Sequence, residues 1–263
     1  MELSKSGALI QRTINRMANY LLHIQYDGTR YKGWQIQKST DNTIQGKLKA
    51  VIEKLFDEEV DIIGSGRTDA GVHALDQIAN FHLNSEIEDL EEFLRDINRY
   101  LPEDIAVNSI EKVADRFHSR YSAKSKTYRY RIYTGIYSNV FERKFVYHYK
   151  DKKLCVEDMI KGAQLLIGQH DFISFCGNKH MKKSSIREIY GISIEESKDE
   201  IIIEYSGNGF LQNMVRIMTG TLIEIGNGSK KPDDIITILR SKDRATAGYT
   251  APPQGLCLVE VNY

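Results

Sequence analysis

The sequence predicts an α/β chain of the α+β type, built from two consecutive βαββαβ units. Stretches in which apolar and polar residues alternate, as in strands, are separated by segments whose apolar residues recur every three or four positions, as in helices. The order strand, helix, strand, strand, helix, strand occurs twice along the 263 residues, which is the order of the ferredoxin-like and RRM folds. We therefore expect mostly antiparallel sheets flanked by helices, with a central active-site cleft between the units.

The first unit spans residues 17–115, and its elements follow from local pattern. An alternating apolar stretch at 22–26 predicts the first strand. Asn42 is expected to cap the next helix, with Gln45 at the capping-box position. The unit is completed by strands at 59–64 and 75–83, a helix over 90–97 that ends before Pro102, and a strand at 104–112.

The second unit spans residues 116–263 and repeats this order. Residues 1–16 precede the pattern and are expected to form a mobile N-terminal extension. The predicted elements of the second unit are a strand at 125–133, a helix over 159–167, strands at 186–195 and 200–206, a helix over 214–225, a short helix from Pro232 and a closing strand at 256–261.

Composition argues against several classes of protein. No apolar run approaches the ~20 residues that a helix needs to cross a bilayer, and no apolar segment of a secretory signal is found at the N-terminus. The cysteines, Cys155, Cys176 and Cys257, are isolated and odd in number. This pattern favours a reducing compartment such as the cytoplasm over a disulfide framework.

Charge is balanced overall but unevenly distributed. The 36 basic residues equal the 36 acidic ones, yet residues 84–111 are mainly acidic and residues 115–153 mainly basic. A basic stretch of this length can follow a phosphate backbone even in a neutral protein. A solvated surface with blocks of charge would give the same pattern.

The most informative segment is the run GSGRTDAG at 64–71, which lies between two predicted strands. Its three glycines indicate a tight loop, and their spacing satisfies neither the dinucleotide fingerprint nor the P-loop. Asp69 is its single carboxylate and follows Arg67 by two residues. A carboxylate beside a guanidinium stays ionised, and when fixed in place it can act as a nucleophile. From the residues alone, an Arg67–Asp69 pair that braces the turn is an equally good reading.

Two further segments carry candidate site residues. Around Tyr128, aromatics interleave with arginines, which suits base stacking beside phosphate contacts, although a half-buried strand also uses tyrosine as a core residue. We assign Tyr130 to the core. Arg216 lies among apolar residues, so its guanidinium must reach the surface or pair with an acid.

Other polar residues have simpler readings. His73 is expected to support the turn after the glycine-rich loop, and Trp34 suits either RNA contact or local packing. The group His170, Cys176 and His180 matches no zinc pattern and lacks a fourth ligand, so no metal site is predicted.

The string GRTDAGVHA at 66–74 resembles the signature of the TruA-type tRNA pseudouridine synthases. Four other segments are similar to motifs of that family and occur in the same order. The resemblance covers nearly the whole chain after residue 18. The four segments are 26–35 (YDGTRYKGWQ), 121–130 (YSAKSKTYRY), 209–216 (GFLQNMVR) and 251–256 (APPQGL).

The resemblance implies an enzyme that converts uridine to pseudouridine at positions 38, 39 and 40 of the anticodon stem-loop of tRNA. Asp69 would be the catalytic residue after the target base has left the stack, and Tyr128 would stack on that base. Asp69 would act as a nucleophile on the ribose C1′ or on the base, or as the group that stabilises and deprotonates a glycal-like intermediate, and the sequence does not choose among these. Arg67 and Arg216 would bind substrate, with Arg216 reaching Asp69 from the other unit. The resemblance further implies a homodimer that holds one tRNA. The reaction is an isomerisation, so neither a cofactor nor a metal is expected.

Two alternatives to this function remain open from the sequence. A paralogue could carry out the same chemistry on ribosomal RNA with a changed docking surface. A non-catalytic RNA-binding protein could use the same fold. The positions at which pseudouridine is lost in a deletion strain would distinguish the three.

Overall fold

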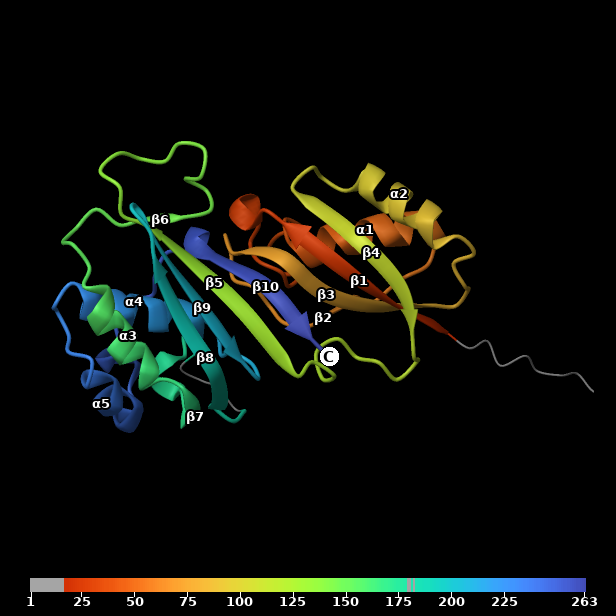
Figure 1. Ribbon diagram of the computed structural model, residues 1–263. Helices are drawn as coiled ribbons and strands as arrows, with labels where there is room; N and C mark the ends of the chain where they lie inside the picture. Colours follow the sequence, from red (N-terminus) through yellow and green to blue (C-terminus); the bar gives the residue numbers. More distant parts are fainter. Residues whose placement is uncertain (1–16, 179–180, 182) are drawn as a thin grey trace, which may run out of the picture.

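A computed structural model describes residues 17–178, 181 and 183–263. The predicted N-terminal extension, residues 1–16, lies outside this range. Within the described residues, ten strands form one sheet and five α-helices flank it (Figure 1). Eight strands follow the order β4-β1-β3-β10-β5-β9-β8-β7, while β2 pairs with β3 and β6 pairs with β5. The predicted α+β fold with a mostly antiparallel sheet is confirmed.

The first half of the chain forms one end of the sheet with its two helices. Its elements are β1 (Ala18–Tyr26), α1 (Ile44–Phe56), β2 (Ile63–Gly64), β3 (His73–Leu83), α2 (Leu90–Tyr100) and β4 (Ile105–Val113). Helix α1 buries Ile44, Leu48 and Ile52, which recur every fourth position and form one face. This periodicity is the signal from which the helix was predicted.

The second half forms the other end of the sheet with three helices. Helix α4 is the most buried of them, since nearly every residue from Met214 to Gly226 is inaccessible. The elements of the second half are β5 (Ser125–Tyr133), β6 (Tyr147–His148), α3 (Val156–Gln164), β7 (Gly168–Asp171), β8 (Ile186–Glu196), β9 (Glu200–Gly207), α4 (Met214–Gly226), α5 (Asp234–Ser241) and β10 (Leu256–Asn262).

The last strand of the chain joins the two halves. Strand β10 runs antiparallel to β5 and pairs in parallel with β3, where Cys257 lies opposite His73. Figure 1 shows β10 between β5 and β3, in the middle of the sheet. The two predicted sheets are therefore continuous, because β10 pairs with backbone groups that would otherwise form exposed edges. This strand also places the loop before β3 next to the second half.

The structure corrects several local predictions. Thr43, not Asn42, caps α1, and its hydroxyl accepts from the amide of Gly46. The side chain of Asn42 instead donates to the carbonyl of Arg30. Gln45 forms no capping box, since its Oε1 accepts from the amide of Ile36, 2.9 Å away. The strand predicted at 59–64 is reduced to β2, and the short pairings of β6 and β7 were not predicted.

In the described part of the chain, we find no helix both long and apolar enough to span a membrane.

Candidate active site

The glycine-rich loop between β2 and β3 is fixed by hydrogen bonds at its first residues. The amide of Ser65 donates to the carbonyl of Ile78 at 2.7 Å, and its hydroxyl donates to Gln77 Oε1 at 2.6 Å. Gln77 Nε2 in turn donates to the carbonyl of Gly66 at 3.1 Å. Ser65 and Gln77 are both fully buried, so these bonds satisfy polar groups that water cannot reach. The start of the loop is therefore rigid.

The segment that precedes α1 holds the rest of the loop. The amide of Trp34 donates to the carbonyl of Thr68 at 3.1 Å, and the Thr68 hydroxyl lies 2.9 Å from that of Tyr26. A Cβ at Gly64 would lie 2.6 Å from the Trp34 ring, so only glycine fits there. Gly71 has φ +78°, a conformation that side chains disfavour. Trp34 is 1% exposed, and of its two readings the structure supports local packing.

Asp69 lies within ion-pair distance of a guanidinium from the other half of the chain. Arg216 Nη1 is 3.1 Å from Asp69 Oδ2, with 14% of the arginine side chain and 27% of the aspartate side chain exposed. Arg216 Nε donates to the carbonyl of Ala251 at 2.7 Å, and Nη1 also donates to Asn213 Oδ1 at 3.1 Å. Several bonds thus orient the guanidinium towards Asp69, and one of its nitrogens makes the contact.

The position of Arg216 in α4 is unusual. It lies in the first turn, where the helix dipole disfavours a cation. The residue before the helix, Asn213, has φ 59°, which turns the chain into α4. The amide of Ala251 donates to the Arg216 carbonyl at 3.0 Å, so Ala251 binds both the backbone and the side chain of Arg216. A cation kept against the local preference indicates a role in the site.

Tyr128 lies beside this ion pair. It is 8% exposed, and its ring meets that of Phe210 edge to face, with centroids 5.2 Å apart. Burial raises the pKa of Tyr128, and the charge of Asp69 raises it further. The hydroxyl therefore keeps its proton and can donate it in a hydrogen bond. Phe210 was not predicted as a site residue, although it lies in one of the motifs noted above.

Arg67 is not the partner of Asp69. Its Nε donates to Gln35 Oε1 at 3.0 Å, and no ion pair joins it to Asp69, both residues being in the described part of the chain. The turn-bracing pair considered from the sequence is therefore absent. The reason is that Asp69 faces α4, while Gln35 holds the Arg67 side chain at the surface.

The arginines interleaved with the tyrosines of β5 are neutralised within the protein. Arg129 pairs with Glu204 at 2.7 Å, and Arg131 pairs with Glu200 and Glu142 at 2.5 and 2.7 Å. They lie on the opposite face of the strand from Tyr128, as alternation predicts. Because each is paired with carboxylate, the expectation that they contact phosphate is not supported. Tyr130 is fully buried, in agreement with its assignment to the core.

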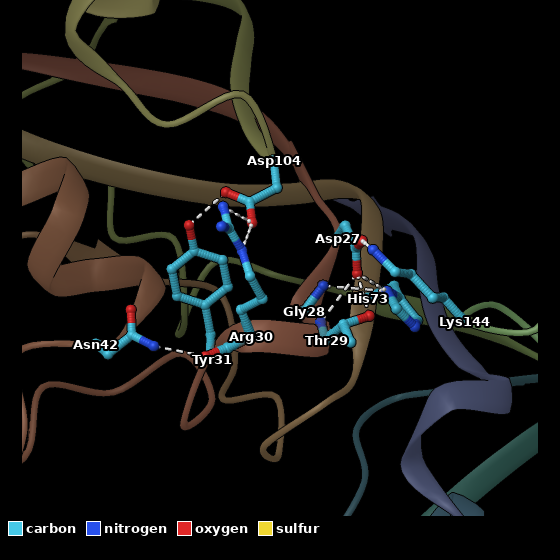
Figure 2. A network of polar contacts seen from close by, with 9 residues as sticks. All are labelled: Asp27, Gly28, Thr29, Arg30, Tyr31, Asn42, His73, Asp104 and Lys144. Carbon is cyan, nitrogen blue, oxygen red and sulfur yellow. Dashed lines mark hydrogen bonds and ion pairs between the residues drawn. The ribbon is translucent and has the colours of Figure 1, made fainter.

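His73 supports the turn that begins near Tyr26. Its Nδ1 accepts from the amide of Gly28 at 3.1 Å and lies 3.3 Å from Asp27 Oδ1 (Figure 2). Burial lowers the pKa of His73, which favours the neutral ring that such acceptance requires. Lys144 reaches Asp27 from the second half at 3.7 Å. The 26–35 motif thus supports the loop through Tyr26 and Trp34. Figure 2 shows that the motif is also held by Asp104, which contacts Arg30 and Tyr31.

No group of three potential metal ligands occurs among the residues that the structure describes. Of the three candidates named from the sequence, His170 Nε2 lies 3.0 Å from the carbonyl of Ile167, and Cys176 is buried. The third, His180, lies outside the described residues.

Comparison with known proteins shows what this chain is similar to. A family model described as tRNA pseudouridine synthase matches residues 22–122 and 163–263. The tRNA pseudouridine synthase A of Bacillus sp. (strain KSM-64) is 49% identical over 249 residues, which cover 94% of this chain and 100% of that protein. The tRNA pseudouridine synthases A 1 of Clostridium tetani and A of Thermoanaerobacter sp. are 47% and 46% identical over 247 residues, with the same coverage.

An aspartate in a rigid loop, a buried tyrosine beside it and these similarities define the class of protein: an RNA pseudouridine synthase, an enzyme that isomerises uridine. Within that class, the chain belongs to the TruA-type tRNA pseudouridine synthase family.

Proposed function

We propose that this enzyme converts uridine to pseudouridine at positions 38, 39 and 40 in the anticodon stem-loop of tRNA. The relatives named above are tRNA pseudouridine synthases along their entire length, which supports tRNA as the substrate. The observation that carries the proposal is the Asp69–Arg216 pair, because it puts an oriented carboxylate between the two halves of the sheet. Asp69, Tyr128, Arg67 and Arg216 are the residues to which we assign roles.

In the proposed reaction, Asp69 is the nucleophile: its carboxylate bonds to the ribose C1′ or to the base, and that bond breaks again before the product leaves. The target nucleotide leaves the helical stack, which costs a few kcal/mol, and its base stacks on Tyr128. The bond from C1′ to N1 breaks, the base rotates, and a bond from C1′ to C5 forms. The hydrogen on C5 leaves as a proton, and N1 gains one. The atoms of substrate and product are the same, so the balance needs neither an oxidant nor a cofactor.

The two arginines have different roles in this proposal. Arg216 holds Asp69 in a fixed orientation towards the substrate, because its guanidinium contacts the carboxylate and is itself held by Ala251 and Asn213. Arg67 has an exposed side chain with one bond to Gln35, so it is free to exchange that bond for a contact with RNA. A guanidinium at the mouth of the site would hold the RNA strand from which the uridine has flipped.

We also propose that the enzyme acts as a homodimer. The segment between β5 and β6 exposes large apolar side chains, with Ile136 88%, Tyr137 83% and Phe141 91% exposed. A hollow of about 410 Å³, lined in part by Leu75 and Phe145, opens on the sheet near this segment. Exposed apolar groups of this kind suit a contact between protein subunits.

The three cysteines are free thiols, which fits action in the cytoplasm.

Mapping of pseudouridine in RNA from a deletion strain tests the substrate. We expect uridine to persist at positions 38–40 of tRNA and pseudouridine to return when the wild-type chain is supplied. Loss of a ribosomal RNA pseudouridine with unchanged tRNA would assign the same chemistry to another substrate. If no pseudouridine were lost anywhere, the proposed function would be wrong.

A further inference from the structure

Apart from Arg67, three cationic residues near the catalytic loop have no acidic partner among the described residues. They are Arg120, which precedes β5, Lys126 on β5 and Arg187 on β8. Among the described residues, no carboxylate lies within ion-pair distance of any of them, although Arg129 and Arg131 on the other face of β5 are both paired. Lys126 and Arg187 are partly buried, whereas Arg120 is exposed. A partly buried cation without a counter-ion is costly, so unpaired groups of this kind beside an active site suggest an anionic ligand.

Lys126 is held against the glycine-rich loop. Its Nζ donates to the carbonyl of Ser65 at 2.5 Å, and a Cβ on Gly66 would lie 2.9 Å from Nζ. This is the single hydrogen bond of its ammonium to described residues, while the ammonium has three donors. Burial, reinforced by the charge of Arg120, lowers the pKa of Lys126 to about 8.

Arg187 is brought towards the same region by the sheet register. Lys126 lies opposite Gly207 on β9, and Gly207 lies opposite Ile189 on β8. Arg187 is two residues before Ile189, so it projects from the face of the sheet that carries Lys126. Its Nη1 donates to the carbonyls of Ser184 and Ile186, while burial lowers its pKa and the charge of Arg120 lowers it further. Arg120 therefore acts electrostatically on both of the other cations.

The cluster also has a defined relation to the proposed uridine site. Lys126 and Tyr128 are two residues apart on one strand, and both project from the same face. Two residues along a strand span about 7 Å. A phosphate bound at Lys126 would therefore lie close to a base stacked on Tyr128.

We propose that Arg120, Lys126 and Arg187 form a binding site for one backbone phosphate next to the target uridine. This inference rests on the proposed function, since the phosphate belongs to the RNA from which the uridine flips. Binding of the negatively charged phosphate would offset the mutual repulsion of the three cations. The free N–H donors of the three side chains would form charge-assisted hydrogen bonds to the phosphate oxygens. Because Lys126 touches Ser65, occupancy of the site would also steady the loop that carries Asp69.

The test is a double-mutant cycle between protein and RNA. The ligand is an anticodon stem-loop RNA in which single phosphates are replaced by neutral methylphosphonates, either flanking the target uridine or far away in the stem. Binding is measured with the Asp69→Asn chain, so that RNA is not converted, and with the same chain carrying Arg187→Gln. Arg240→Gln on α5, at the outer end of the molecule in Figure 1, is the matched control.

We expect one flanking methylphosphonate to weaken binding to the Asp69→Asn chain and to have an effect below about twofold once Arg187→Gln is present. Arg187→Gln should also reduce the salt slope of log affinity by about 0.7, the value for one phosphate contact on a single strand. Arg240→Gln should change neither. Lys126→Gln should show the same coupling, and Lys126→Arg should retain binding.

The phosphate site would be overturned if Arg187→Gln and each flanking methylphosphonate weakened RNA binding independently, so that their losses of binding free energy simply added. A loss of turnover in Lys126→Gln with unchanged RNA affinity would also overturn it and would leave Lys126 as a support for the loop alone. If the wild-type chain formed no pseudouridine in the unmodified RNA, the proposed function itself would fail. These outcomes are therefore distinguishable.

Discussion

Arg216 Nη1 and Asp69 Oδ2 are 3.1 Å apart, although the residues are separated by 147 positions in the chain. The contact joins the first turn of α4 to the loop between β2 and β3. Other bonds fix both partners, since Ala251 and Asn213 hold the guanidinium and Ser65 and Thr68 anchor the loop. Such pre-organisation means that the carboxylate need not be repositioned when substrate binds. The following predictions test what this arrangement does.

Asp69→Asn should abolish turnover and leave RNA affinity nearly intact. The amide keeps the shape of the carboxylate but is neither a nucleophile nor a base, while phosphate contacts elsewhere supply most of the affinity. We expect a loss of more than about a thousandfold in kcat, measured by tritium release from C5-labelled tRNA. Residual activity within about tenfold of wild type, which corresponds to ~1.4 kcal/mol of barrier, would remove Asp69 from the central role.

Arg216→Lys should retain more activity than Arg216→Ala, but less than wild type. The guanidinium makes its bond to Asp69 while also binding Ala251 and Asn213, and an ammonium cannot reproduce this planar set of donors. We expect kcat to fall by about tenfold for the lysine variant and further for alanine, with a smaller effect on KM. Steady-state kinetics on one tRNA substrate checks the order. Equal activity of the lysine variant and wild type would show that orientation is unimportant.

Tyr128→Phe should separate stacking from proton donation. The phenyl ring keeps the contact with Phe210 and the surface for a base, but it lacks the hydroxyl that stays protonated beside Asp69. We expect kcat to fall by about a hundredfold with RNA affinity unchanged, whereas Tyr128→Leu loses both. Single-turnover rates and filter binding give the two readouts. Full activity of the phenylalanine variant would restrict Tyr128 to stacking.

RNA affinity should decrease as the pH rises through about 8. Burial lowers the pKa of Lys126 to about 8, so its ammonium is charged below that pH and neutral above it, and the attraction to phosphate is lost in that direction. The Lys126→Arg variant keeps its charge and should show a smaller decrease between about pH 7 and about pH 8.5. Affinities at constant ionic strength check this. Identical pH profiles for the two proteins would exclude Lys126 as the titrating group.

Gly64→Ala should destabilise the fold and thereby the loop. The new Cβ would lie 2.6 Å from the buried Trp34 ring, and overpacking of this kind costs about 1–3 kcal/mol in the free energy of unfolding. Gly191→Ala on β8 is the matched control, because nothing lies within 4 Å of its added Cβ. Urea denaturation of both variants provides the measurement. If the two had the same stability, tight packing at Gly64 would not be what fixes the loop.

The sequence by itself determined the elements of the fold and the location of the carboxylate. Periodicity predicted α1, α2, α4 and β5 because burial of one face depends on residues within a few turns or positions of each other. The glycine spacing predicted the loop around Asp69, since backbone conformation there is a local property. The prediction of a cap at Asn42 failed by one residue, because Thr43 and Asn42 are both competent caps and contacts with Arg30 selected between them.

Only the tertiary structure decided which charges meet. From the residues alone, Arg67 was one candidate partner of Asp69, whereas the family resemblance implied Arg216. The structure shows that Gln35 holds Arg67 and that Arg216 makes the contact. The same holds for the basic strand, where Arg129 and Arg131 are neutralised by glutamates of other segments while Lys126 is not. Long side chains on adjacent residues can diverge, and ion pairs between segments depend on how strands such as β10 bring the halves together. Local sequence patterns carry no information about that packing. They therefore identified the ionisable and aromatic residues of the site, whereas the three-dimensional fold determined which of these side chains contact one another.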